Sequence, residues 1–292
     1  MTDSQKRNQL LSAGYITFEN VLETEMVDEL SRVTDGLLAE QSKEDAEYYR
    51  YQGSNITVNY QHPVFARLFA LPRALAALSA LGFDAPKFRS GHLLSKPPNA
   101  PPLYWHQDWV AWDDECSGWE VAAQVFLMYY LTDTNRENGC LRLLPGTHRK
   151  RIPFHDELPP AHEEKIYGAS LDSAVFTTHP DEVDVPVKAG DLVIGDARLL
   201  HAAHANRTNQ HRSLLTLWYF PDYDSLPDSI KARTARKKPL KPPDWWEGDV
   251  GAAVEPLIPY YEGEAEPSVY NRVPGEYLGR TPGTTEPLRR RR

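Results

Sequence analysis

Three side chains able to bind a divalent metal stand in an order that is typical of one kind of iron site. His106 and Asp108 are separated by a single residue, and His201 follows much later in the chain. Two histidines and one carboxylate form the facial triad that holds non-heme Fe(II) and leaves further coordination positions open to substrates. Arg212, shortly after His201, can offer a bidentate guanidinium to a carboxylate. Together the four residues predict an oxygenase whose co-substrate carries a carboxylate.

The His-x-Asp tripeptide is expected to lie on a strand. Residues i and i+2 of a strand project to the same side, so His106 and Asp108 would face one metal ion while Gln107 points away. Such tripeptides also occur by chance, so this one alone is weak evidence for a metal site. The distant histidine and the arginine strengthen the prediction.

The second imidazole ligand must be chosen between His201 and His204. The two cannot share one face of a strand, so only one of them is expected to bind the metal. We select His201, because a hairpin turn through residues 205–211 would then place Arg212 beside it on the adjacent strand.

The elements that position these residues begin with a short strand and two helices. Residues 15–18 are predicted to form the strand. Thr24 is predicted to cap a helix with apolar residues at helical spacing, which are Met26, Leu30, Val33 and Leu37. A second helix is predicted over residues 71–82, with Pro72 near its start and Gly82 at its end.

From about Phe88 onward, short β-rich stretches alternate with Pro, Gly and Asn clusters. This texture predicts a mainly β sandwich or barrel. Three of the strand candidates are residues 121–131, 191–206 and 212–220. Another follows Asn138-Gly139, a dipeptide that predicts a hairpin turn.

Several motifs resemble one known family in their order and spacing. They are "WHQD", "NGCLRLLPGTH" and "GD…LLHAAHANRTNQHR", together with the opening "GYITFENVL". They resemble the phytanoyl-CoA dioxygenase family of Fe(II)- and 2-oxoglutarate-dependent oxygenases over residues 13–220. The resemblance implies a double-stranded β-helix, which is a cupin-like jelly-roll of two facing sheets, with flanking N-terminal α-helices. It also implies Fe(II) as cofactor and 2-oxoglutarate and O2 as co-substrates.

The resemblance also implies roles for individual residues. The three that match the family's iron ligands are His106, Asp108 and His201. Arg212 matches the arginine that pairs with the distal carboxylate of 2-oxoglutarate. Trp112 matches an aromatic position that lines the site in some relatives, and Asn206 matches a frequent asparagine. Residues 138–148 match a structural hairpin.

The chain departs from the family pattern around the co-substrate. Many relatives carry a serine two residues after the distal histidine, where this chain has Ala203. Ser213, Thr216 or a tyrosine of the strand at 121–131 could replace that contact. Met128 falls where some relatives place a tryptophan that contacts the co-substrate. These departures concern the secondary contacts and leave the triad and its arginine in place.

The ligand set favours hydroxylation. A glycine or alanine in place of Asp108 would open a position for chloride, whereas a carboxylate there favours hydroxylation of a small organic molecule, with 2-oxoglutarate decarboxylated to succinate and CO2. The same ligands would also serve desaturation, cyclisation or endoperoxide formation on a natural product. A non-catalytic jelly-roll binding protein and a metal hydrolase are the alternatives of other classes. The intact triad argues against the first, and Arg212 has no use in the second.

Length and composition predict a single cytoplasmic domain, and the oxygenase family that the chain resembles implies a small-molecule substrate. The 292 residues carry a net charge of -9, which argues against a general nucleic-acid binder. No apolar run of 18 residues predicts a membrane span, and the polar residues 1–9 do not have the apolar region expected of a signal peptide. Two cysteines make no disulfide framework. The domain is expected to cover residues 1–292, with a core at 13–220 and an irregular extension at 221–292, and the oligomeric state stays open.

Long polar segments at residues 150–186 and 222–275 are expected to shape the substrate site. Trp245 and Trp246 would either pack a loop onto the barrel or cap the substrate, and the role of the basic stretch 231–241 is left open. The arginine tail at 289–292 and Lys96 are interpreted as solvated. His92 is a candidate for the pocket. The other histidines are interpreted as surface or loop residues: His62, His148, His155, His162, His179 and His211.

Overall fold

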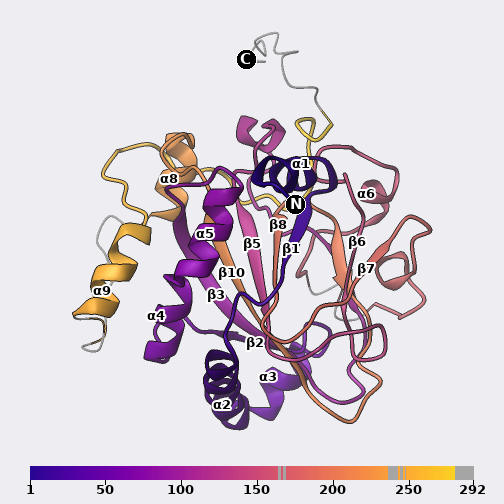
Figure 1. Cartoon of the computed structure of the whole chain (residues 1–292). Coiled ribbons are helices and arrows are strands. Elements are labelled where there is room, and N and C mark those ends of the chain that lie inside the picture. The colour runs from indigo at the N-terminus through magenta and orange to yellow at the C-terminus, as the bar shows by residue number, and fades with distance from the viewer. Residues whose placement is uncertain (164–165, 167–168, 236–242, 244–245, 247, 280–292) are drawn as a thin grey trace.

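In the computed structural model, two antiparallel sheets face each other and helices cover the outer side of the larger one (Figure 1). The structure describes residues 1–163, 166, 169–235, 243, 246 and 248–279. In the large sheet the order is β1 (Tyr15–Phe18), β8 (Leu192–Asp196), β5 (Val125–Tyr130), β10 (Arg212–Phe220), β3 (Lys87–Lys96) and β2 (Ser54–Thr57). In the small sheet it is β4 (Leu103–His106), β9 (His201–Ala203), β6 (Leu141–Leu143) and β7 (Val183–Val185). The predicted jelly-roll is confirmed.

The central strands of the large sheet are buried on both faces. On β10, Leu215 and Leu217 pack toward the helices, whereas Leu214 packs toward the small sheet. On β5, Tyr129 packs toward the helices and Met128 packs toward the small sheet. Because strand residues alternate between faces, one run of apolar residues fills two cores. The core between the sheets is open at one end, where the polar cavity described below lies.

The helical layer is larger than the sequence predicted. It contains α2 (Thr24–Glu40), α4 (Pro63–Phe69) and α5 (Pro72–Ala80), which pack on the outer face of the large sheet (Figure 1). Thr24 is the first residue of α2 and makes no cap, because Glu23 holds the N-cap position. Gly82 lies just beyond α5 with a φ of 80°, as expected of a helix stop. Residues 63–80 are apolar enough for a membrane span, but they form two helices and half of the stretch is buried in the core.

Further helical segments were not predicted. They are α1 (Asp3–Ala13), α3 (Lys43–Tyr48), α6 (Phe154–Glu157), α8 (Asp228–Thr234) and α9 (Asp249–Val254), with single turns of 3₁₀ helix at η1 (Glu115–Gly118), η2 (Ala174–Phe176) and η4 (Glu255–Leu257). Thr2 caps α1 through a capping box with Gln5. Polar sequences such as that of α1 lack a strong apolar period, which is why periodicity did not reveal them.

Both predicted hairpins are wrong. The Asn138-Gly139 turn follows β5 and precedes β6, and these strands lie in different sheets. Residues 205–211 likewise lead from β9 in the small sheet to β10 in the large sheet. The two connections meet at an isolated bridge between Asn138 and Asn206. A turn signal reports a local change of direction, whereas the partner of a strand depends on which sheet buries its apolar face.

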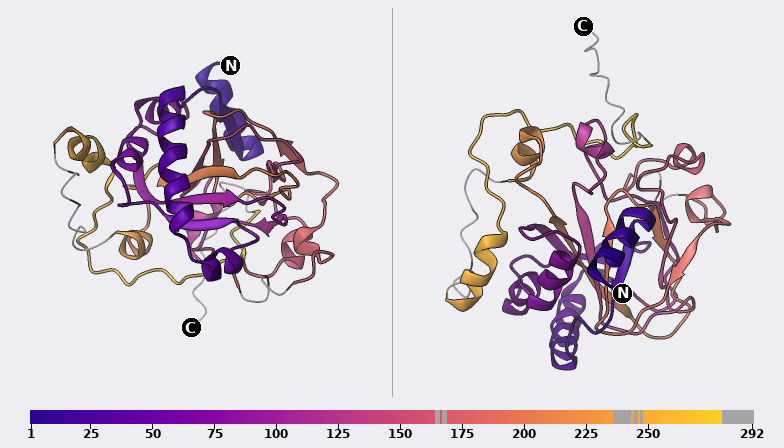
Figure 2. Two further views of the ribbon diagram at one scale, coloured as in Figure 1. Left: turned by 90° about the horizontal axis from the view of Figure 1, so that it is seen from below. Right: turned by 45° about the horizontal axis from the view of Figure 1, so that its top comes forward.

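The C-terminal extension runs back across the molecule (Figure 2). Its residue Asn271 forms a bridge with Ala111, and its backbone N–H donates to the Val110 carbonyl at 2.8 Å. Trp246 packs against Tyr60 and the helical core, so it holds a loop onto the fold and does not cap the cavity. Trp245, residues 236–242 of the basic stretch and the arginine tail lie outside the described residues.

Candidate active site

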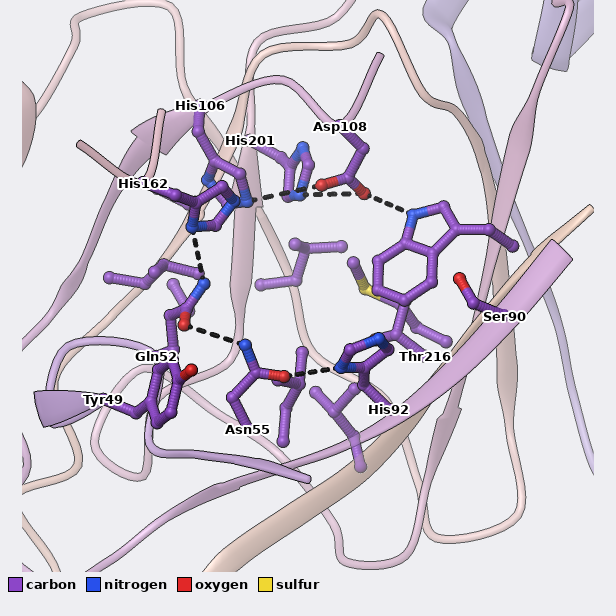
Figure 3. Close-up of a pocket in the computed structure, with 18 of the residues that line it drawn as sticks. Tyr49, Gln52, Asn55, Ser90, His92, His106, Asp108, His162, His201 and Thr216 are labelled. Carbon is purple, nitrogen blue, oxygen red and sulfur yellow. Dashed lines mark hydrogen bonds and ion pairs between the residues drawn. The ribbon is translucent and has the colours of Figure 1, made fainter. Parts of the chain in front are cut away.

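Two histidines and one aspartate converge at the end of the small sheet (Figure 3). His106 is the last residue of β4 and His201 the first of β9, and the two are paired in the strand register. Asp108 lies two residues beyond β4, where its backbone N–H donates to the Ala197 carbonyl at 2.8 Å. Its carboxylate oxygens lie 3.7 Å from His106 Nε2 and 3.9 Å from His201 Nε2. All three ligand atoms lie within 4.8 Å of one another, a spacing that one metal ion can bridge.

Hydrogen bonds leave the Nε2 atom of each histidine available. Nδ1 of His106 lies 3.0 Å from the Tyr104 carbonyl, and Nδ1 of His201 lies 3.0 Å from the Leu199 carbonyl. A carbonyl can only accept, so Nδ1 carries the proton and Nε2 has a free lone pair. Burial and the neighbouring His201 hold the pKa of His106 well below its ordinary value. The neutral form is the one that binds metals.

Asp108 is held as a carboxylate. Burial raises its pKa, but the two histidines and the Trp218 indole outweigh burial and bring the pKa below its ordinary value. Trp218 Nε1 donates to one of its oxygens, Oδ2, at 2.8 Å. This donor, on β10, links the small-sheet ligands to the large sheet.

Arg212 approaches the same cavity from the large sheet. It is only 3% exposed, and within the described residues no carboxylate pairs with its guanidinium. Its Nε is buried without a hydrogen-bond partner. Burial lowers its pKa, although Tyr130 and Cys140 oppose this effect. A buried cation without an anion is costly, so this residue fits an anionic co-substrate.

One cavity of about 410 Å³ joins these groups. The two sheets line it, with the triad residues and Arg212 among its walls. Met128, Thr216 and Tyr130 also line it, and the buried hydroxyl of Thr216 has no partner. The three ligand atoms and the unpaired guanidinium therefore fit a metal ion together with an acid that bridges it to Arg212.

Three other predicted site residues lie outside the cavity lining. Trp112 is fully buried in a separate apolar cluster with Trp109 and Phe220. Ser213 alternates away from the cavity and bonds Ser95 at 2.7 Å. Asn206 secures the connection before β10, because its side-chain amide donates to three carbonyls, those of Lys96, Pro97 and Gln210.

His204 turns away from the triad. Its Nε2 lies 2.6 Å from Asp184, and Arg136 contacts the same aspartate at 3.3 Å. Cys140 completes a second group with metal-binding atoms. Because Asp184 is already paired with two side chains, we interpret this group as a local ion pair.

The cavity has a polar wall of which the sequence predicted only His92, and His92 does line the cavity. His162 was interpreted as a surface or loop residue, but its Nδ1 lies 2.8 Å from Gln52 Nε2 (Figure 3). The same nitrogen lies 2.6 Å from the Tyr104 hydroxyl. Asn55 joins Gln52 at 3.2 Å and His92 at 2.6 Å. Burial lowers the pKa of His162 to about 3, so its imidazole is neutral. The two sides of this wall are far apart in the chain, and no local pattern marks them.

Three more residues that were predicted to lie at the surface or in loops are buried: Lys96, His148 and His155. Lys96 is fully buried, and its Nζ donates to the carbonyls of Tyr51 and Pro101. His148 and His155 are 1% and 5% exposed. His148 bonds the Leu11 carbonyl of α1 at 3.1 Å, so its burial depends on a helix that the sequence did not predict.

A jelly-roll with two histidines, a carboxylate and a buried arginine around one cavity defines the class of non-heme iron oxygenases that use a 2-oxo acid. Residues 10–214 match the family described as phytanoyl-CoA dioxygenase (PhyH). The chain belongs to this family of Fe(II)- and 2-oxoglutarate-dependent dioxygenases. The predicted family, enzyme class and cofactors are confirmed.

Individual relatives are distant. An ectoine dioxygenase of Sphingopyxis alaskensis is 27% identical over 220 residues, which cover 70% of this chain and 72% of the relative. HygX of Streptomyces hygroscopicus, solved with nickel and 2-oxoglutarate bound, has a TM-score of 0.56 at 19% identity. The similar region covers 74% of this chain and 86% of the HygX chain. SnoK, a carbocyclase from nogalamycin biosynthesis, has a TM-score of 0.54 at 22% identity. The similar region covers 86% of this chain and 97% of the SnoK chain. The two structures share the fold.

Proposed function

We propose that this dioxygenase hydroxylates a small organic molecule, with His106, Asp108 and His201 as the iron ligands. The observation that carries the proposal is their convergence in one cavity with Arg212, a buried cation that pairs with no carboxylate of the described residues. Bound iron would couple O2 to decarboxylation of 2-oxoglutarate and to oxidation of a C–H bond. The balanced reaction takes one substrate, one 2-oxoglutarate and one O2 to the alcohol, succinate and CO2.

Arg212 is proposed to bind the distal carboxylate of 2-oxoglutarate. Arg212 lies at one end of β10, and Trp218, near the other end, donates a hydrogen bond to Asp108. This one strand would therefore set the position of the co-substrate carboxylate relative to the metal ligands. Thr216 and Tyr130 face the same cavity and are candidates for the contact that Ala203 does not supply. Ser213 is bonded on the other face, which argues against that choice.

The remaining predicted residues are proposed to act by positioning. Asn206 holds the connection that delivers Arg212 to the cavity, and Trp112 packs beneath the segment that carries Asp108. Asp108 supplies a carboxylate where a halogenase would need an open position. A cytoplasmic location is also proposed, since both cysteines are free and buried.

The role of Arg212 can be tested with Arg212→Ala. Loss of a charge-assisted pair should weaken 2-oxoglutarate binding about 10- to 100-fold, as expected for about 1.5–3 kcal/mol. The measurement is an anaerobic titration of the iron-loaded protein with 2-oxoglutarate, followed by its charge-transfer absorbance. Arg207→Ala is the matched control, because Arg207 is 70% exposed in the same connection. An unchanged Kd in the Arg212 variant would remove this residue from the co-substrate site.

A further inference from the structure

Two more arginines line the cavity, and sequence reasoning singled out neither of them. Arg89 lies near the start of β3, and Arg272 lies in the C-terminal extension. Within the described residues, neither forms an ion pair with a carboxylate of the protein at salt-bridge distance. The mechanism proposed above uses neither of them, since Arg212 is assigned to 2-oxoglutarate.

A β-bulge aims Arg89 into the cavity. Trp218 pairs with Ser90 and Tyr219 pairs with Phe88, so Arg89 is the extra residue where the β10–β3 register shifts. Phe88 stacks on Phe69 on the helical side, at 4.2 Å between ring centroids. Arg89 and Ser90 both line the cavity. Bulges commonly re-aim a side chain beside an active site, and here the bulge turns a cation inward.

The surroundings of Arg89 leave its charge uncompensated. Its Nη1 donates to Gln124 Oε1 at 2.7 Å, and the Nε2 of the same glutamine is buried without a partner. Burial and Arg272 lower the pKa of Arg89 to about 10, which still leaves it charged at neutral pH. The nearby carboxylate, Asp108, belongs to the metal triad.

The C-terminal extension supplies the second cation. Arg272 follows Asn271, whose bridge to Ala111 fixes the extension beside the segment that carries Asp108. Its guanidinium stacks over the Tyr270 ring at 5.4 Å, and Nη1 donates to the Gln107 carbonyl at 3.4 Å. Two guanidiniums in one cavity wall repel each other unless an anion lies between them.

The position of this pair separates it from the 2-oxoglutarate site. In the backbone register of β10 and β3, Arg212 lies opposite Lys96 at one end of the two strands. Arg89 is next to Ser90, which lies opposite Trp218 toward the other end. Six residues of strand at about 3.3 Å each put roughly 20 Å between the two backbone positions. Trp218 holds Asp108, so the second cationic end lies beside the metal ligands.

We propose that the prime substrate carries an oxyanion, either a carboxylate or a phosphate, which Arg89 and Arg272 bind beside the iron site. The inference rests on the proposed dioxygenase function and assigns its substrate class. The neutral chain of His92, Asn55, Gln52 and His162 would then contact the uncharged part of the same molecule.

The test is a screen of matched compound pairs with the iron- and 2-oxoglutarate-loaded enzyme. Each pair contains a small carboxylate or phosphate ester and its neutral amide or alcohol, and the readouts are succinate formation and direct binding by calorimetry. The anionic member should bind and stimulate, and the neutral member should be weaker by about 10- to 100-fold. Separate carboxylate and phosphate series identify which oxyanion is preferred.

Variants connect that preference to the two arginines. Arg89→Gln and Arg272→Gln should each remove most of the discrimination, and Arg89→Lys should restore part of it. Arg149→Gln is the control, because this arginine pairs with Glu120 at the surface and should keep full discrimination. Neutral members that bind and stimulate equally well in the wild type would overturn the inference, as would full discrimination in both glutamine variants. Failure of iron and 2-oxoglutarate to bind at all would instead contradict the proposed function.

Discussion

At the scale of the residue, the two histidines of the candidate triad are prepared in the same way. Each donates its Nδ1 proton to the carbonyl two residues before it in the chain. This local bond sets the tautomer of each imidazole and directs its Nε2 toward the point that the three ligand atoms surround. The third member, Asp108, depends on a partner far away in the sequence, the Trp218 indole. The ligand set is therefore oriented partly by its own strands and partly by the opposite sheet.

Trp218→Phe tests the contribution of that distant bond. The phenyl ring keeps much of the packing but cannot donate to Asp108, so Fe(II) affinity should fall about 10- to 100-fold, the usual effect of losing a residue that orients a metal ligand. Anaerobic Fe(II) titration measures the Kd. Trp246→Phe, on the helical side of the molecule, should leave it unchanged. Equal Kd values for the two variants would show that the indole does not orient the ligand.

At the scale of the element, a buried ion pair lies at the end of β8. It connects this strand to the segment that follows the triad aspartate. Arg198 donates to both carboxylate oxygens of Asp196, at 2.6 and 3.0 Å. Its Nη1 donates to the carbonyls of Ser117 and Trp119, at 2.9 and 2.7 Å. Both charged side chains are nearly inaccessible, with exposures of 2% and 4%. The pair connects a central strand to η1 and its neighbours.

Asp196→Asn should lower the free energy of unfolding by about 3–5 kcal/mol at neutral pH, because it leaves the buried arginine without an anion. Burial raises the pKa of Asp196, but Arg198 outweighs it and brings the pKa below the ordinary value. A depressed pKa stabilises the fold above the ordinary aspartate pKa of about 3.9, and this stability is lost as the pH falls through the depressed value. The difference between wild type and variant should therefore shrink in acid.

Denaturant unfolding across a pH series measures this difference. Asp133→Asn is the control, because its pair with Lys188 is exposed at the surface and should contribute little to stability. A stability difference for Asp196→Asn that stays constant into strong acid would argue against an ionised Asp196 in the folded state.

At the scale of the whole molecule, the active cavity is assembled from both sheets, from loops beside them and from the C-terminal extension. The small sheet and the residues just after β4 supply the candidate triad, the large sheet supplies Arg212 and Arg89, and the C-terminal extension supplies Arg272. Among the contacts that attach the extension are the backbone bonds of Asn271 and its side-chain amide, which donates to Asp113 at 2.9 Å. The same side chain accepts from the Val273 N–H within the extension at 2.8 Å. A segment held mainly by hydrogen bonds at the surface is expected to open locally before the buried sheets do.

Asn271→Ala should loosen this segment without unfolding the sheets. The two lost side-chain bonds correspond to about 1–2 kcal/mol, so the population of the open segment should rise by a factor of about 5–30. Limited proteolysis with mass spectrometry would locate faster cleavage within residues 259–279. Val269→Ala is the control, since that side chain is 70% exposed. Equal cleavage rates in both variants would show that the Asn271 side chain does not anchor the extension.

The chemistry could be predicted because its residues are few and their types are specific. His106, Asp108, His201 and Arg212 are recognisable by type and order alone, and strand alternation predicted that only one of His201 and His204 would join the triad. The helix predicted over 71–82, which the structure has at Pro72–Ala80, and the strand at 15–18 follow from local pattern as well. These features depend on neighbours in the sequence.

Tertiary structure decided what surrounds those residues. His201 and Arg212 face each other from two sheets, where the turn between them had suggested a hairpin. Arg89 enters the cavity through a bulge that only pairing with β10 creates, and His162 and Arg272 come from loops without pattern. The sequence by itself determined the metal-binding chemistry, because ligand identity is a property of single side chains. The substrate wall arose only on folding, because burial and pairing between distant segments decide which loop residues meet there.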